Sequence, residues 1–210
     1  MLQRTPEAPG DRRARILDAA ERCFVRTGFH RATMQEIATE AGMSPGNLYR
    51  YFPSKDAMVE GLAGRDRADI ARDFERFAEG EDFLAVFKEL GRKHFAEEPR
   101  GKAIMCLEIW AEATRNPVFA RLTSSFEQDV VERLADLLEA ARVAGSVSPE
   151  IEPRAIATLI STLANGLFVR KAIVPAFDAA SEVPRFLALI CGLLEGKISL
   201  SLPELAEVPQ

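Results

Sequence analysis

The spacing of apolar residues constrains the fold of this chain more than any other feature of its sequence. Apolar side chains recur every three or four residues almost throughout, as at Ile16, Ala20, Cys23 and Phe24, and no segment shows sustained alternation of apolar and polar residues. The first pattern is typical of a helix with one buried face, whereas the second would indicate a half-buried strand. The sequence therefore predicts an all-α fold of about nine helices and no sheet.

Residues that favour helix ends divide the chain into elements. Gly28 is expected to end the first helix, and Thr33 to cap the second, with Glu36 placed to complete a capping box. Ser44 can cap a third helix that opens with Pro45, where a missing N–H costs nothing. Further boundaries are predicted at Gly42, Pro53, Ser54, Pro99, Asn116–Pro117 and Gly145, with a turn-rich connector over 147–153. The later helices are expected over 54–77, 83–94, 104–114, 119–141, 156–167 and 186–194.

The sequence predicts neither a membrane span nor a secretion signal. Its longest uncharged run, Ala155–Val169, has 15 residues, which is shorter than the roughly 20 apolar residues that a bilayer span requires. Charged residues crowd the N-terminus where a signal would need an apolar stretch. The three cysteines lie far apart and form neither a disulfide framework nor a metal spacing. We therefore expect a cytoplasmic protein with no membrane contact, no metal and no cofactor.

The charge of the chain is distributed unevenly. Residues 1–55 contain nine Lys and Arg against six Asp and Glu, whereas residues 56–210 contain eighteen against twenty-six. A basic head on an acidic body indicates that only the head meets a polyanion. An excess of three positive charges can also arise by chance, so this pattern leaves both interpretations open.

The segment Thr33–Tyr51, TMQEIATEAGMSPGNLYRY, has the pattern of a helix-turn-helix. Such a motif needs a small residue where its helices touch, a turn residue that tolerates left-handed backbone, and apolar residues that seal the packing. Ala38, Gly42 and Leu48 meet these needs, and the helix from Pro45 would enter the major groove of DNA. We expect a helix-turn-helix DNA-binding domain over 1–55, a second helical domain over 56–200, and a frayed tail over 201–210.

The stretch from about Arg12 to Leu62, a quarter of the chain, resembles the N-terminal DNA-binding domain of TetR/AcrR-type transcriptional regulators. The matching residues are Gly28–Phe29, Thr33, Ile37–Ala38, Ala41–Gly42 and the run GNLYRYFPSKD over 46–56. The resemblance implies phosphate contacts from Thr33, Ser44, Tyr51 and Lys55, and a groove-facing surface of Pro45, Gly46, Asn47, Tyr49 and Arg50. Asn47, Tyr49 and Arg50 are expected to discriminate bases. At Tyr51 packing within the domain is the favoured role, whereas at Tyr49 packing is the alternative to DNA contact.

The resemblance also implies a homodimer formed by the last two long helices, and hence a palindromic operator. The sequence allows this, because Ala155–Val169 is apolar on nearly every side. Small residues that would permit close approach are Ala157, Ser161, Ala164 and Gly166. The alternative is a helix buried inside a monomer. The resemblance makes 56–200 the ligand-binding and dimerisation domain. It also implies that the chain is a DNA-binding transcriptional regulator, and the expected form is a ligand-responsive repressor.

An effector cavity would lie in the helical body. Aromatic and Met side chains with few polar groups are typical of pockets for small apolar ligands. The candidate ligand-binding residues are Phe83, Phe87, His94, Met105, Trp110, Phe126, Asn165 and Phe168. Each of them can instead belong to the core. The pattern favours a hydrophobic or aromatic effector without identifying it.

The sequence shows no catalytic constellation. GMSPG over 42–46 spells the G-x-S-x-G of a nucleophile elbow, but that elbow needs a preceding strand and a His base. Glu108 and Glu112 lie one helical turn apart and could form a carboxylate pair, yet a solvated helix face relieved by Arg115 is the favoured interpretation. We expect no enzyme activity. The competing class is a small all-α ligand carrier or enzyme with an incidental helix-turn-helix.

Overall fold

The computed structural model describes residues 9–79 and 82–199, and this part of the chain contains nine α-helices and no strand. The helices are α1 Pro9–Thr27, α2 Met34–Glu40, α3 Pro45–Tyr51, α4 Lys55–Glu75, α5 Phe83–Arg92, α6 Arg100–Ala113, α7 Pro117–Val143, α8 Pro153–Ile173 and α9 Ala179–Leu194. A 3-10 turn, Arg76–Glu79, follows α4, and a π-turn, Lys93–Glu97, follows α5. The predicted all-α fold is confirmed. The expected frayed tail over 201–210 lies outside the described residues.

Local capping chemistry fixes the ends of the short helices as predicted. The Thr33 hydroxyl accepts a hydrogen bond from the Glu36 N–H at 3.2 Å, and the Glu36 carboxylate accepts one from the Thr33 N–H at 2.8 Å. Ser44 caps α3 by accepting from the Asn47 N–H at 3.3 Å. Gly28 and Gly42 end α1 and α2 with φ of +83° and +66°, a conformation that favours glycine.

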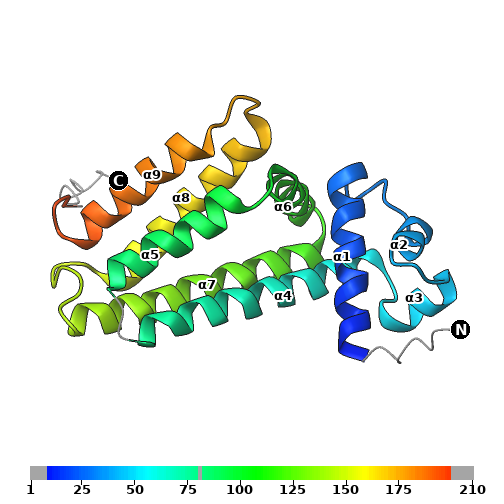
Figure 1. The fold of residues 1–210 in the computed structure, drawn as a ribbon, viewed down its shortest axis with the longest axis horizontal. Coiled ribbons are helices and arrows are strands. Elements are labelled where there is room, and N and C mark those ends of the chain that lie inside the picture. The colour runs from blue at the N-terminus through cyan, green and yellow to red at the C-terminus, as the bar shows by residue number, and fades with distance from the viewer. Residues whose placement is uncertain (1–8, 80–81, 200–210) are drawn as a thin grey trace, which may run out of the picture.

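Helices α1 to α3 form a head at one end of the molecule (Figure 1). Its core gathers Phe24 of α1, Ile37 of α2 and Leu48 of α3, each almost fully buried. Phe52, Met58 and further residues of α4 belong to the same cluster. The first three helices thus lean on the fourth, because they bury too little apolar surface alone.

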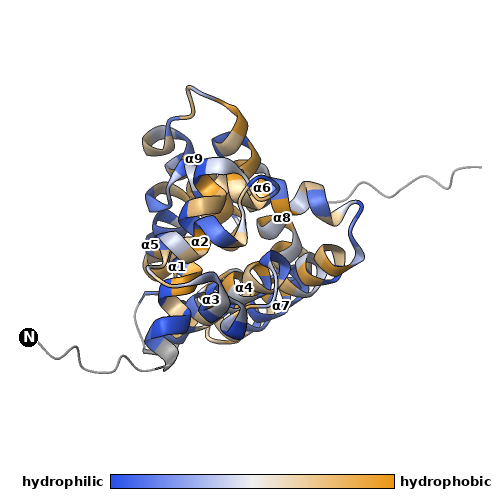
Figure 2. Cartoon of the chain, turned by 90° about the vertical axis from the view of Figure 1, so that its right-hand side faces the viewer, coloured by the Kyte–Doolittle hydropathy of each residue, from blue (hydrophilic) through white to orange (hydrophobic). Residues whose placement is uncertain are grey.

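Helices α4 to α9 form the body. Helices α4 and α7 run side by side, α8 packs on α6 and α7, and α5 packs on α9 (Figure 1). Seen from the head end, α9 and α7 lie on opposite sides of the molecule (Figure 2). Helix α6 packs on α7 and α8 of the body and also contacts α1 of the head.

Helix α8 is the one helix in the described ranges that is long and apolar enough to cross a membrane, judged by length and composition alone. Its residues Ile156, Ala157 and Ile160 are buried in a core cluster with Leu134 of α7 and Ile190 of α9. This packing is that of a central helix in a helical body. It also corrects one expectation: Ala157 is buried in the chain's own core rather than facing a partner, and Ser161 and Ala164 line the cavity described below.

Candidate functional site

Helix α3 has one face in the core and one on the surface. Leu48 is fully buried, whereas Tyr49 is 52% exposed and Arg50 is exposed beside it. Pro45 and Gly46 in the first turn are also exposed, and Asn47 is half-buried. Helices α2 and α3 lie at the end of the molecule away from α9 (Figure 1). The surface of α3 is therefore open to a groove of DNA.

The predicted phosphate-binding residues surround α3, and each also has a structural task. Thr33 and Ser44 are exposed, but their hydroxyls cap α2 and α3. Tyr51 is half-buried and packs against the head core, and its carbonyl accepts a hydrogen bond from Arg13 Nη1 at 3.3 Å. The packing role of Tyr51 is thus present in the structure.

Lys55, at the start of α4, holds the turn between α1 and α2. Its ammonium group donates to the carbonyl of Phe29 at 2.6 Å and to that of His30 at 3.0 Å, and it lies 4.7 Å from the centre of the Phe29 ring. Burial lowers the pKa of Lys55, against the opposing effect of Asp56 and Glu36. An ammonium group has three donors, so one remains for a phosphate.

Helix α6 reaches the same turn from the body. A Glu108 carboxylate oxygen accepts a hydrogen bond of 2.6 Å from the Phe29 N–H, and Glu112 Oε2 lies 3.3 Å from His30 Nε2 and 2.8 Å from Arg115. The expectation of a solvated helix face at Glu108 and Glu112 is therefore wrong, although Arg115 does pair with Glu112 as expected. The sequence pattern missed it because the contact joins residues 79 positions apart.

A cavity of about 520 Å³ lies in the body, walled by residues of α4 to α9. Seven of the predicted ligand-binding residues line it: Phe87, His94, Met105, Trp110, Phe126, Asn165 and Phe168. Phe83 does not line it, which corrects that expectation. Its ring packs instead against Phe77, at 5.0 Å between ring centres, and against Phe87, at 6.4 Å.

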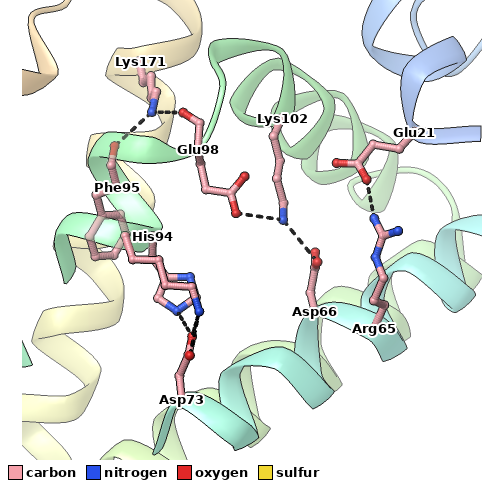
Figure 3. Close-up of polar contacts among 10 residues, drawn as sticks. Glu21, Arg65, Asp66, Asp73, His94, Phe95, Glu98, Lys102 and Lys171 are labelled. Atoms are coloured by element: carbon pink, nitrogen blue, oxygen red, sulfur yellow. Dashed lines mark hydrogen bonds and ion pairs between the residues drawn. The ribbon is translucent and has the colours of Figure 1, made fainter. Parts of the chain in front are cut away.

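Ion pairs join α4 to the π-turn and α6 along one wall of the cavity (Figure 3). The buried Asp73 accepts from Lys93 Nζ at 2.6 Å, and one of its oxygens lies 2.8 Å from His94 Nε2. Burial raises the pKa of Asp73, but the hydrogen bond from Lys93 and the charge of His94 outweigh it, so the pKa lies below its ordinary value.

The second group of ion pairs on this wall is formed by Lys102 of α6. Its ammonium group donates to Asp66 at 3.2 Å and to Glu98 at 3.4 Å. Burial lowers the pKa of Lys102, but the two carboxylates outweigh burial and the pKa is raised. Burial likewise raises the pKa of the neighbouring Cys106 thiol to about 12, which makes it a poor nucleophile.

A third polar group lies on the cavity wall, and the sequence predicts its Asn165 but neither Glu127 nor the role of Ser161. The Ser161 hydroxyl donates to Glu127 Oε1 at 2.5 Å, and the Asn165 amide donates to Glu127 Oε2 at 3.5 Å. All three residues line the cavity. A signal existed, because Glu127 interrupts an apolar face of α7 between Phe126 and Val130.

An exposed helix-turn-helix, a separate body with a cavity, and a helix that contacts both define the class: an all-α DNA-binding regulator. Two family models match the chain. One, for bacterial regulatory proteins of the tetR family, matches residues 16–62, and the other, for the C-terminal part of BetI-type transcriptional repressors, matches residues 92–194.

Curated relatives agree with this class. The transcriptional regulator UidR of Escherichia coli is 31% identical over 170 residues, which is 81% of this chain and 85% of UidR. The repressor KstR of Mycobacterium tuberculosis is 33% identical over 156 residues, 74% of this chain and 68% of KstR. The chain belongs to the TetR family of transcriptional regulators, and it is a DNA-binding regulator and not an enzyme.

Solved structures show the same fold. Salmonella enterica GusR is 26% identical with a TM-score of 0.74, over 90% of this chain and 98% of GusR. FadR of Thermus thermophilus, solved in complex with lauroyl-CoA, is 25% identical with a TM-score of 0.61, over 94% of this chain and 99% of FadR. The alternative of a carrier or an enzyme with an incidental helix-turn-helix does not fit these relatives.

Proposed function

We propose that this protein is a cytoplasmic, homodimeric, ligand-responsive repressor that binds a palindromic operator and releases it when an effector enters the cavity. The observation that carries the proposal is α6, which lines the cavity through Met105 and Trp110 and holds the head through Glu108. A ligand that displaces α6 would therefore also displace the turn that positions α2 and α3.

The DNA contacts proposed are those of the exposed surface of α3. Tyr49, Arg50 and Asn47 would read base edges, and the residues at the helix ends would contact phosphates. The groove-facing set is Pro45, Gly46, Asn47, Tyr49 and Arg50, and the phosphate set is Thr33, Ser44, Tyr51 and Lys55. Exposure of Tyr49 and Arg50 supports this assignment, because a packing role would bury them.

The proposed dimer forms through the outer faces of α8 and α9. Thr158, Thr162 and Gly166 are exposed at four-residue intervals along α8, and Ile173 is 59% exposed at its end. Leu189 of α9 is 43% exposed. Small and apolar side chains on one exposed face suit close helix packing, and two-fold pairing would present two copies of α3 to a palindrome.

The proposed mechanism is a population shift. Helix α4 lines the cavity with Asp66 and Asp73 and, through Lys55 at its start, holds the turn at Phe29 and His30. Helix α6 reaches that turn through Glu108. An effector acts as an inducer if it binds more tightly to the state in which the two heads cannot engage DNA together.

Selection of bound sequences from random DNA tests the proposal, followed by a gel shift on the selected site. We expect enrichment of a palindrome, binding as a dimer, and an affinity that falls steeply as salt rises, because phosphate contacts release counterions. Recovery of no common sequence, or of a site without two-fold symmetry, would contradict the proposed operator.

A further inference from the structure

The charged residues around the cavity leave negative charge unpaired. The lining holds five carboxylates, Asp66, Asp69, Asp73, Glu98 and Glu127, against three Lys and Arg residues. Each of these cations is already paired: Lys93 with Asp73, Lys102 with Asp66 and Glu98, and Arg72 with Asp69. An anionic ligand would have to break one of these pairs before it gained a partner.

Glu127 differs from the other four carboxylates. Within the residues that the structure describes, no Lys, Arg or His forms an ion pair with it. Its two oxygens accept instead from neutral donors, the hydroxyl of Ser161 and the amide of Asn165. Neutral donors orient a carboxylate without cancelling its charge, and a charge that faces an apolar cavity attracts a counterion more strongly than one in water.

The surroundings of Glu127 suit an organic cation rather than a metal ion. No group of three or more His, Cys, Asp or Glu side chains in the described ranges could hold a metal. Aromatic residues line the same cavity, among them Trp110, Phe126 and Phe168. Aromatic faces attract cations and also bury apolar surface. Ser161, Asn165 and Phe168 follow one another at helical spacing, so one face of α8 carries both kinds of contact.

We infer that the cavity selects an amphipathic organic cation, an amine or quaternary ammonium on an apolar body, with Glu127 as the counterion to its charge. This inference rests on the proposed function, since it names the chemical class of the effector. It refines the expectation of a hydrophobic or aromatic effector by adding a positive charge at a defined place.

Two probes with the same chain and opposite charge test the inference on the full-length protein. Octyltrimethylammonium and octyl sulfate are titrated below their micelle concentrations. The intrinsic fluorescence reports binding at the cavity, because Trp110 lines it and is the one Trp of the chain. We expect the cation to bind at least about tenfold more tightly than the anion. Equal affinities, or tighter binding of the anion, would overturn the inference.

The variant Glu127→Gln keeps the size of the side chain and removes its charge. We expect its affinity for the cation to fall about tenfold and its affinity for octyl sulfate to stay or rise. Glu132→Gln is the matched control, because Glu132 is exposed on the same helix outside the cavity lining. An unchanged ratio of cation to anion affinity in folded Glu127→Gln would overturn the role of Glu127. If this variant does not fold, the comparison of the two probes on the unaltered protein still decides.

A gel shift on the selected operator separates this inference from the proposed function. One outcome is that the protein binds its palindrome while the cation neither binds the protein nor releases it from the DNA. In that case the effector class is wrong and the proposed regulator stands. If no palindrome is bound while the cation binds through Glu127, the proposed operator fails and the cation site stands.

Discussion

Tyr49 and Arg50 are exposed although they belong to a helix that also holds the fully buried Leu48. Because the structure does not use these two side chains for packing, their proposed role in DNA binding can be tested with little effect on stability. We expect Tyr49→Ala and Arg50→Ala each to weaken operator binding by about 1–3 kcal/mol. Fluorescence anisotropy with the selected operator, at one fixed salt concentration, measures this loss.

The matched control for Arg50→Ala is Arg133→Ala, because Arg133 is exposed on α7 in the body. It removes the same charge far from α3, so its effect on affinity reports only the change in net charge. If Arg50→Ala weakened binding no more than Arg133→Ala, the assignment of Arg50 to base reading would be wrong.

Asp73 provides a prediction about pH. Its pKa in the folded protein lies below its ordinary value because Lys93 and His94 stabilise the carboxylate. The stabilisation is therefore complete above about pH 4, the ordinary pKa, and is lost as the pH falls through the folded pKa. We expect Asp73→Asn to lower the free energy of unfolding at pH 6 by about 1–3 kcal/mol, and this difference to shrink towards pH 3.

Urea unfolding of both proteins at several pH values between 6 and 3 measures that difference. Asp136→Asn, which removes an exposed carboxylate of α7, controls for the change in net charge. If the difference in the free energy of unfolding stayed constant over this pH range, the ionised form of Asp73 would not be what stabilises the fold.

At the scale of elements, the body contacts the head at the turn between α1 and α2. Gly28 has a φ of +83°, and a Cβ there would come within 2.9 Å of the Glu108 carboxylate. Gly42 has a similar φ of +66° but open space around it. Gly42→Ala should cost about 1–2 kcal/mol of folding stability from backbone strain alone. Gly28→Ala should cost about 1 kcal/mol more, because Glu108 must leave the Phe29 N–H.

Chemical denaturation measures both costs, and a double variant isolates their cause. In a Glu108→Ala background the added Cβ has nothing to displace, so the extra cost of Gly28→Ala should disappear. If the extra cost persisted there, contact with Glu108 would not be its source.

The elements that the sequence predicts well are those defined by neighbouring residues. The Thr33–Glu36 capping box, the Ser44–Pro45 start of α3 and the glycine at position 42 depend on contacts within a few positions, and the structure has them as predicted. The sequence predicts that α6 begins at Ile104, whereas it begins four residues earlier, at Arg100. Its first turn is held from afar by Arg100, which donates to the carbonyls of Lys171 and Ala172.

The candidate site likewise contains residues that the sequence predicts and contacts that it does not. Aromatic residues such as Trp110 and Phe168 could be proposed for the cavity from composition and helical spacing alone, and they line it. The pairing of Asp73 with Lys93 and the contact of Glu108 with Phe29 join residues 20 and 79 positions apart. Such pairs depend on how helices pack, which one sequence without a structure does not specify.

At the scale of the molecule, the head lies at one end of the chain, away from α9, which carries part of the proposed dimer face (Figure 1). In the proposed dimer the distance between the two copies of α3 depends on how α8 and α9 pair. Leu189→Glu should break that pairing, because it places a charge on a face that would be buried in the dimer. We expect a mass near 23.2 kDa, that of one chain, for this variant and twice that mass for the unaltered protein.

Light scattering after size-exclusion chromatography measures the mass, and anisotropy with the operator measures the functional consequence. Val143→Glu is the matched control, because Val143 is 76% exposed at the end of α7, away from the proposed face. A monomeric Leu189→Glu protein should lose most of its affinity for the full palindrome yet keep weak binding to a half-site, since its own α3 is intact. A variant that remained dimeric, or a monomer that bound the palindrome as tightly as before, would show that α9 does not pair the heads and that another surface must set their spacing.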